Sequence, residues 1–398
     1  RYYHPTQPTS RIDLSVVRKT GANVINLHHN TLWNPYINYP YNEDGGPLLK
    51  RFVAEAHREG LRVKVYYTTR EITQNMPEFM CLNALGGEII FKRDGRVAGW
   101  PITNGSGPHP QLVALAGDAI LPAWREKVSF PEAYPPRNDL SVITNPDSRR
   151  WCNFYLSGLD LLVRDYGIDG LYVDDTALDR TAMRRARRIL DCDGRRDRLV
   201  DMHSWSHFNE HCGWIPSDVA YLELYPYLDR LWHGEDFTDD LPPDVWLIER
   251  SGFAWGLAGE MLGRGNPFRG LLFGQTDRLG WGGKPEGTWR FFDDVDMGSM
   301  RPYGWWESEP QVVVEGDGAD VKATLWRGGR TDVLVLANWA KGEKTVSFRV
   351  RGHEGGVWRV PAIADVQEAG TDWSEGEVCR LAGNGGVVLV RGKEGECK

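Results

Sequence analysis

The stretch GIDGLYVDDTALDR, residues 167–180, lies between two segments with helical spacing and constrains the fold more than any other part of the chain. Residues 168–173 supply the β-branched, aromatic and aliphatic side chains of a short buried strand. Two carboxylates, Asp174 and Asp175, follow at its end. Successive strand side chains face opposite ways, so one carboxylate should point into the space at the strand end. The alternative is that either residue only caps a helix beginning near Ala177.

The same alternation of a helical segment and a short apolar strand recurs through the first three quarters of the chain. A helix over 12–20 leads into a strand at 23–27, and LLKRFVAEAHREG leads into LRVKVYYTTRE. We predict a helix over 256–262 and treat VAYLELY as a loop or an edge strand. The predicted strands begin at Asn23, Leu61, Ser141, Ile168, Leu199, Asp229, Val245 and Leu271. Eight strands alternating with helices predict an α/β fold, a closed (β/α)8 TIM-type barrel.

The pattern changes near Trp306 to alternating strands with tight turns, as in VKATLWRGGRTDVLVLANWAKGEKTVSFRV. This pattern predicts a small C-terminal antiparallel β-sandwich. We therefore expect a catalytic barrel over residues 1–308, with a long insertion at about 72–139, and a sandwich domain over residues 309–398. Long irregular insertions often form lids or walls of binding sites.

Composition excludes some classes of function. The 398 residues carry a formal net charge of −8, which argues against a nucleic-acid partner, and no apolar run is long enough to span a membrane. The 17 Trp, 15 Tyr and 13 Phe suit a carbohydrate ligand, because amphipathic rings stack on sugar faces. We expect no cofactor.

The cellular location stays undetermined, although one sequon, Asn104-Gly105-Ser106, favours a secreted protein. The six cysteines have neither zinc spacing nor a disulfide framework. Because the chain starts RYYHPTQ, without Met or a signal peptide, we expect a processed or excised form or a part of something longer.

Polar residues follow several of the predicted strands. Parallel strands of a barrel all end on one face, so these residues should line one pocket. We expect Trp100 or Trp124 of the insertion to close over it. The candidate substrate-binding residues are His28, His29, Tyr67, Arg70, Glu71, Trp100, Asp175, His203, Trp205, Glu223, Trp232 and Glu249.

We considered whether the residues at these strand ends fit three kinds of catalytic chemistry. Glycoside hydrolysis needs two carboxylates, and Asp174 and Glu235 are on separate strands with aromatic neighbours. His203, His207 and His211 are four residues apart, so they could bind a metal ion together if they lay on one helix. No HExxH arrangement is present, however, and we predict no metal site. A nucleophilic Ser or Cys is not expected, because no GxSxG elbow or local Cys signature occurs.

Four stretches, NPYINYPYNEDGGPLLKRFVAEAHREGLRVKVYYTTRE, GIDGLYVDDTALDR, LYPYLDRLWHGEDF and GLAGEMLGRGNPFRGLLFGQTDRLGW, resemble a barrel family grouped with glycoside hydrolase family 123. Members of that family usually carry an additional N-terminal β-sandwich, so the resemblance implies a fragment or processed form with a missing N-terminal domain, or a larger assembly. More distantly, SVITNPDSRRWCNFYLSGLDLLVRDYGIDGLYVDD resembles the retaining α-glycosidases of the α-galactosidase clan.

The two resemblances imply different mechanisms. The clan implies Asp174 as a nucleophile and a carboxylate two strands later, Glu235, as the acid/base, although the clan usually has Asp there. Family 123 implies that the substrate's acetamido group attacks, assisted by an adjacent Asp-Glu pair. Here the nearest pairs are Asp174-Asp175 and Glu235-Asp236. We predict a retaining glycoside hydrolase; the alternative is an inactive barrel that binds carbohydrate or has a structural role.

Overall fold

The chain was analysed as a computed structural model, which describes most of residues 1–393. Outside the description lie residues 6, 8, 29–37, 44, 70, 75, 91–121, 129–136, 146, 175–178, 205–221, 234–239, 262–264, 353–355 and 394–398. Only the backbone is described for residues 122–128, 137–140, 204, 233 and 249. The chain forms two compact units, the first of residues 1–236 with 255–257, and the second of residues 237–254 with 258–398.

The first unit is organised around a parallel sheet. Its strands follow one another in the order β1, β2, β3, β7, β8, β9. Their bounds are β1 Tyr2–Tyr3, β2 Val24–Leu27, β3 Arg62–Tyr66, β7 Gly170–Asp174, β8 Leu199–Ser204 and β9 Arg230–His233. β7 and β8 approach closely because residue 170 is a glycine: a Cβ there would lie 2.1 Å from the Leu199 carbonyl oxygen. Five of these strands confirm predicted ones.

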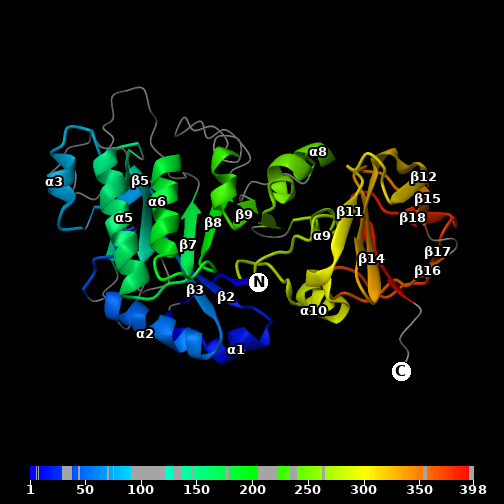
Figure 1. Cartoon of the computed structure of the whole chain (residues 1–398), viewed down its shortest axis with the longest axis horizontal. Coiled ribbons are helices and arrows are strands. Elements are labelled where there is room, and N and C mark those ends of the chain that lie inside the picture. Colours follow the sequence, from blue (N-terminus) through cyan, green and yellow to red (C-terminus); the bar gives the residue numbers. More distant parts are fainter. Residues whose placement is uncertain are drawn as a thin grey trace. The chain divides into compact units, whose positions relative to one another are not determined.

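Helices connect the strands, and Figure 1 shows α2, α5 and α6 running alongside the sheet. The bounds are α1 Leu14–Lys19, α2 Gly45–Arg58, α5 Arg149–Arg164 and α6 Arg180–Leu190. In α5, for example, Trp151, Tyr155, Leu159 and Leu162 recur at helical spacing and are all buried. The strand side chains Val63, Val65, Leu171 and Val173 are also buried, and they alternate along β3 and β7 with Lys64, Tyr66, Tyr172 and Asp174.

The other face of the sheet is polar and aromatic. Asn26 lies opposite Lys64, Tyr172 opposite Asp201, and Asp174 opposite His203 on neighbouring strands. The sheet is strongly curled, because Tyr2 of β1 and Trp232 of β9 have ring centroids only 5.0 Å apart although four strands separate β1 from β9. The curled sheet therefore encloses a polar interior.

The structure corrects three predicted barrel strands and one helix. The strand at Ser141 is β6 (Arg137–Ile143), which pairs antiparallel with β4 (Glu71–Thr73) and β5 (Pro122–Val128) in a separate sheet. Residues 243–250 form helical turns, and Leu271 ends helix α9. Residues 258–261 are instead a strand, where we predicted a helix. Short apolar runs do not distinguish these outcomes, because a buried helix turn and a buried strand need the same side chains.

The second unit contains the segment after β10 and a pair of antiparallel sheets. β10 is Ala258–Met261, and helices α9 (Pro267–Leu271) and α10 (Glu286–Val295) follow. One sheet has the order β11, β13, β14, β19 and the other β12, β15, β18, with a separate pair β16, β17. Their bounds are β11 Arg301–Gly304, β12 Val312–Gly316, β13 Val321–Arg327, β14 Thr331–Asn338, β15 Lys344–Val350, β16 Val357–Trp358, β17 Trp373–Ser374, β18 Cys379–Leu381 and β19 Gly386–Gly392.

The two larger sheets share one core, in which Leu334 and Leu389 of one sheet pack in the same cluster as Phe348 of the other. This confirms the predicted antiparallel C-terminal domain; the boundary at residue 308 and the extent of the insertion stay predictions. The short helices are η1 Thr9–Arg11, α3 Phe79–Asn83, η3 Leu222–Tyr227, α8 Pro243–Val245, the π-helix η4 Trp246–Arg250, η5 Phe253–Trp255, η6 Met297–Ser299 and η7 Gly318–Asp320.

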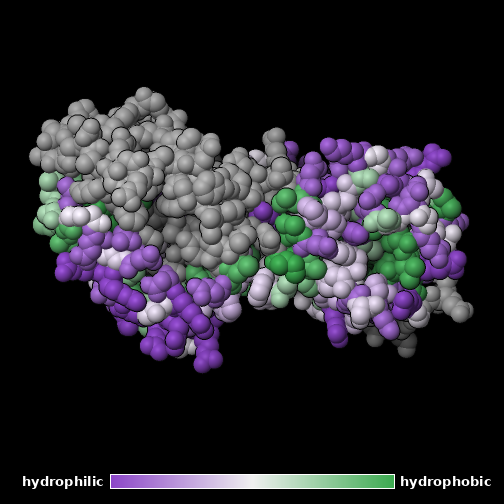
Figure 2. Space-filling view, turned by 90° about the horizontal axis from the view of Figure 1, so that it is seen from above, coloured by the Kyte–Doolittle hydropathy of each residue, from purple (hydrophilic) through white to green (hydrophobic). Residues whose placement is uncertain are grey.

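On the face seen in Figure 2, the described surface is mostly hydrophilic, with smaller hydrophobic patches. Among the described residues, Trp255 and Trp281 are the large aromatic side chains that are substantially exposed, at 43% and 39%. No helix in the described ranges is both long enough and apolar enough to cross a membrane.

Candidate active site

Asp174, the last residue of β7, lies at the centre of a group of contacting polar side chains. Its Oδ1 is 2.6 Å from His203 Nδ1, and its Oδ2 accepts a hydrogen bond of 3.0 Å from the Tyr66 hydroxyl. Asp174 is 8% exposed. It does not cap the next helix, because Asp179 accepts from the first backbone N–H groups of α6. Its side chain instead contacts His203 and Tyr66 at the strand end.

Glu71 joins this group through Tyr66. The Tyr66 hydroxyl oxygen is also 2.5 Å from Glu71 Oε1, so it lies between the carboxyls of Glu71 and Asp174. Glu71 is 1% exposed. Asn38 fixes the local backbone: its amide donates to the Glu71 carbonyl at 2.7 Å and accepts from the Thr68 N–H at 2.9 Å.

Aromatic rings pack around the two carboxyls. The His28 ring lies 4.4 Å from the Tyr66 ring, and the Tyr172 ring lies 6.1 Å from the His203 ring, centroid to centroid. Four predicted site residues are thus brought together: His28, Glu71, Asp174 and His203. Tyr66, which connects three of them, is absent from our prediction. The alternation of Val63 and Val65 with Lys64 and Tyr66 was the available signal, because it places Tyr66 on the polar face.

A buried ion pair lies deeper in the polar interior. Lys64 Nζ contacts Asp201 Oδ2, and both side chains have no exposed surface. Trp232 Nε1 donates to the same Asp201 oxygen at 2.9 Å. Burial lowers the pKa of Lys64 to about 8, although the neighbouring Asp201 opposes this shift.

The structure does not bring all predicted residues to Asp174. The Tyr67 hydroxyl donates to the Tyr155 carbonyl at 2.9 Å and its ring stacks on Tyr155, so Tyr67 packs against α5. Its complete burial raises the pKa of its phenol well above the usual value. Trp232 is fully buried against the rings of Tyr2 and His4, which leaves no ring face for a sugar.

Other predicted residues lie away from strand ends or outside the description. Glu223 belongs to η3 and interacts electrostatically with Arg180. The Glu249 backbone belongs to η4, and its side chain is not described. Outside the described residues lie His29, Arg70, Trp100, Asp175, Trp205 and Glu235, together with the Trp124 side chain.

Metal binding has no support from the side chains that the structure describes. Within these ranges, no group of three or more His, Cys, Asp or Glu residues could hold a metal ion. His207 and His211, which the spacing argument paired with His203, lie outside them.

Comparison with known proteins assigns the family. Residues 1–280 match the family described as glycoside hydrolase 123, TIM-barrel domain, and residues 284–391 match its C-terminal domain. The chain belongs to glycoside hydrolase family 123. This membership confirms the resemblance seen in the sequence and makes the protein a glycoside hydrolase. No curated protein matches the sequence.

Solved structures support the fold of this family 123 enzyme. An α-amylase from Anoxybacillus has a TM-score of 0.57 and 9% identity, and the alignment covers 100% of this chain and 98% of the amylase. A maltogenic α-amylase from Thermotoga neapolitana has a TM-score of 0.54, 10% identity and coverage of 98% and 96%. Trehalose-6-phosphate hydrolase from Bacillus licheniformis has a TM-score of 0.54, 10% identity and coverage of 98% and 99%. The TIM-type barrel followed by a C-terminal domain is confirmed.

Proposed function

We propose that the enzyme cleaves glycosidic bonds of an oligosaccharide, polysaccharide or glycoconjugate with retention of configuration, and that Asp174 is the nucleophile. The observation that carries this proposal is the convergence of the Tyr66 hydroxyl and His203 Nδ1 on the two oxygens of Asp174. Hydrogen bonds donated to a carboxylate favour its charged form and fix its direction, which an attacking carboxylate needs. Glu235 is our candidate acid/base, as the second carboxylate of a retaining mechanism.

Tyr66 and Glu71 serve Asp174 as positioning residues in this proposal. The Tyr66 hydroxyl is within hydrogen-bonding distance of both carboxyls, so it fixes the position of Asp174 at the strand end relative to the buried Glu71.

A trapping experiment tests the retaining mechanism. A panel of nitrophenyl glycosides first identifies a sugar that is turned over. The matching 2-deoxy-2-fluoro glycoside with a good leaving group should then form a stable adduct on the peptide containing Asp174, detected by mass spectrometry. Proton NMR of the first product should show the anomer of the substrate. An adduct on another residue, or an inverted product, would refute the assignment.

Family membership favours a second mechanism, in which the substrate's own acetamido group attacks the anomeric carbon and Asp174 orients that group. The same panel separates the two mechanisms. Substrate assistance requires a 2-acetamido sugar, gives no covalent adduct, and is inhibited by a thiazoline analogue of the cyclised sugar. Turnover of a sugar with a 2-hydroxyl group, accompanied by an adduct on Asp174, supports the nucleophilic mechanism.

Tyr66→Phe tests the positioning role. We expect kcat to fall by about 10²-fold, because the variant loses one hydrogen bond that aims the attacking carboxylate. The acidic limb of the pH profile of kcat/KM should move to higher pH, since a carboxylate that loses a donor takes up a proton more readily. Tyr67→Phe is the matched control, because its hydroxyl donates to the Tyr155 carbonyl in α5 rather than to Asp174 or Glu71. If Tyr66→Phe lowers kcat without moving the limb, the role is structural.

A further inference from the structure

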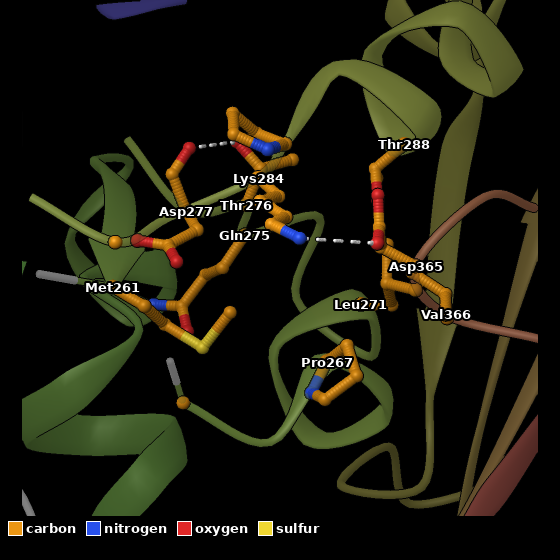
Figure 3. A pocket seen from close by; sticks show the side chains of 13 residues that line it. Met261, Pro267, Leu271, Gln275, Thr276, Asp277, Lys284, Thr288, Asp365 and Val366 are labelled. Carbon is orange, nitrogen blue, oxygen red and sulfur yellow. Dashed lines mark hydrogen bonds and ion pairs between the residues drawn. The ribbon is translucent and has the colours of Figure 1, made fainter. Parts of the chain in front are cut away.

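A pocket of about 300 Å³ lies in the second unit, between the segment after β10 and a loop of the C-terminal domain. Figure 3 shows Met261, Gln275 and Asp277 on one side and Asp365 and Val366 on the other. A volume of this size is at the lower end of the range for small-molecule sites.

The pocket is built around a strand end. Met261, the last residue of β10, donates its N–H to the Thr276 carbonyl at 2.9 Å, and a parallel bridge joins Met261 to Asp277. This single bridge holds Asp277 beside the last residue of β10, and the carboxyl ends of barrel strands are where barrel enzymes present functional side chains. Gly283 makes room for it, because a Cβ at that position would come within 2.7 Å of Asp277 Oδ2.

The lining combines an apolar surface with charges of both signs. Met261, Leu271 and Val366 supply apolar atoms, and Lys284 Nζ lies 4.0 Å from Asp365 Oδ1. This ion pair is weak, since its side chains are 73% and 54% exposed. Sugar hydroxyls can donate to a carboxylate and accept from an ammonium group. A polyhydroxylated ring can therefore replace the direct contact between the two charges.

A strained tryptophan is adjacent in the chain to a residue that lines the pocket. Trp281 has φ +53° and precedes Gly282, which lines the pocket and has φ +92°. The Gly283 N–H donates to the Gly280 carbonyl at 3.1 Å, which closes the tight turn. A bulky residue at positive φ is an outlier, and such strain clusters at functional sites. The Arg278 guanidinium covers one face of the ring at 4.5 Å, while 39% of Trp281 is exposed.

We propose that this pocket is a sugar-binding site, in which Asp277, Lys284 and Asp365 bind the hydroxyls of one pyranose and the exposed face of Trp281 contacts the saccharide. The ligand class rests on the proposed function, because a saccharide is the expected substrate. The site itself rests on the second unit alone.

Fluorine NMR of 5-fluorotryptophan-labelled Asp174→Asn protein tests the proposal without turnover. Trp281→Phe assigns the Trp281 resonance by its disappearance, and Trp255→Phe assigns that of the other exposed tryptophan. The probes are the methyl β-glycosides of glucose, galactose and their 2-acetamido-2-deoxy forms. We expect at least one to shift the Trp281 resonance saturably, with a Kd of about 1 mM or weaker, and to leave Trp255 unchanged.

Two variants remove the polar contacts. Lys284→Met and Asp365→Asn should each weaken this binding by about tenfold, because each deletes a charge-assisted hydrogen bond. Both side chains are largely exposed, so the variants should keep their fold, which circular dichroism checks. Three outcomes overturn the proposal: no probe shifts Trp281, the shift is the same in both variants, or inorganic phosphate shifts it and no sugar does. Failure of Asp174 in the trapping experiment leaves this binding result unaffected.

Discussion

Asp174→Asn should lower kcat by about 10⁴-fold or more on every substrate, because the amide cannot attack the anomeric carbon. Asn keeps the size of the side chain and an oxygen that accepts from Tyr66, so the variant should fold normally. Steady-state kinetics with the substrate found in the nitrophenyl panel measures the loss. Near-normal turnover would show that Asp174 is not the nucleophile, and Asp175 or Glu249 would be the next residue to test.

Glu235→Gln provides the contrast. We expect this variant to keep activity on substrates with good leaving groups, which need little protonation in the first step. Azide should rescue Glu235→Ala by attacking the glycosyl-enzyme intermediate, whereas it should not rescue Asp174→Asn, which cannot form that intermediate. Equal losses for Glu235→Gln on activated and unactivated substrates would remove Glu235 from the acid/base role.

Lys64→Met should lower the free energy of unfolding by about 3–5 kcal/mol, because Asp201 would remain buried without its cation. In a unit of this size the loss corresponds to a decrease in Tm of about 10 °C. The double variant Lys64→Met/Asp201→Asn should recover at least half of the loss, since the Asn oxygen can still accept from Trp232 Nε1. Thermal unfolding of the two single variants and the double variant measures this coupling. Additive losses would contradict it.

The pH dependence of stability has a defined sign for Lys64. Its pKa in the folded protein, about 8, is below the ordinary value of 10.5. Between these values the unfolded chain binds more protons, so the contribution of Lys64 to stability rises with pH from about 8 to about 10.5, by about 3 kcal/mol. Below pH 8 the contribution is constant. As the pH rises from about 8 to about 10.5, the Tm of the wild type should therefore increase relative to the Tm of the double variant.

The predictable parts of the fold are those in which a long helical pattern precedes an apolar strand. α5 and β7 satisfy this condition, and both lie where the sequence places them. β1 was missed because two aromatic residues at a chain end have no period to detect. β6 was assigned to the barrel because its apolar residues carry no information about strand direction, and its partners β4 and β5 are antiparallel.

The site was predictable only in part, for a related reason. Strand-end position identifies Asp174 and His203, because both end neighbouring parallel strands. The same criterion wrongly selects Tyr67. This residue comes one position after the end of β3, so its side chain points to the opposite face of the sheet from Tyr66. Trp232 packs within the polar interior because the sheet is strongly curled. The degree of curling cannot be predicted from the spacing of residues along the chain.

The buried contact between Lys64 and Asp201 also selects one alignment of the strands over its neighbours. If β3 slipped by one residue against β7, Lys64 would move to the helix-covered face among apolar side chains, and Asp201 would lose its cation. A sheet with apolar side chains on both faces would tolerate such a slip more easily, because every register would bury similar groups. In the misaligned forms Lys64 and Asp201 would each be a buried charge without its partner, one on each side of the sheet, which raises the free energy of those forms. The buried ion pair therefore specifies the one alignment in which Tyr66 reaches Asp174.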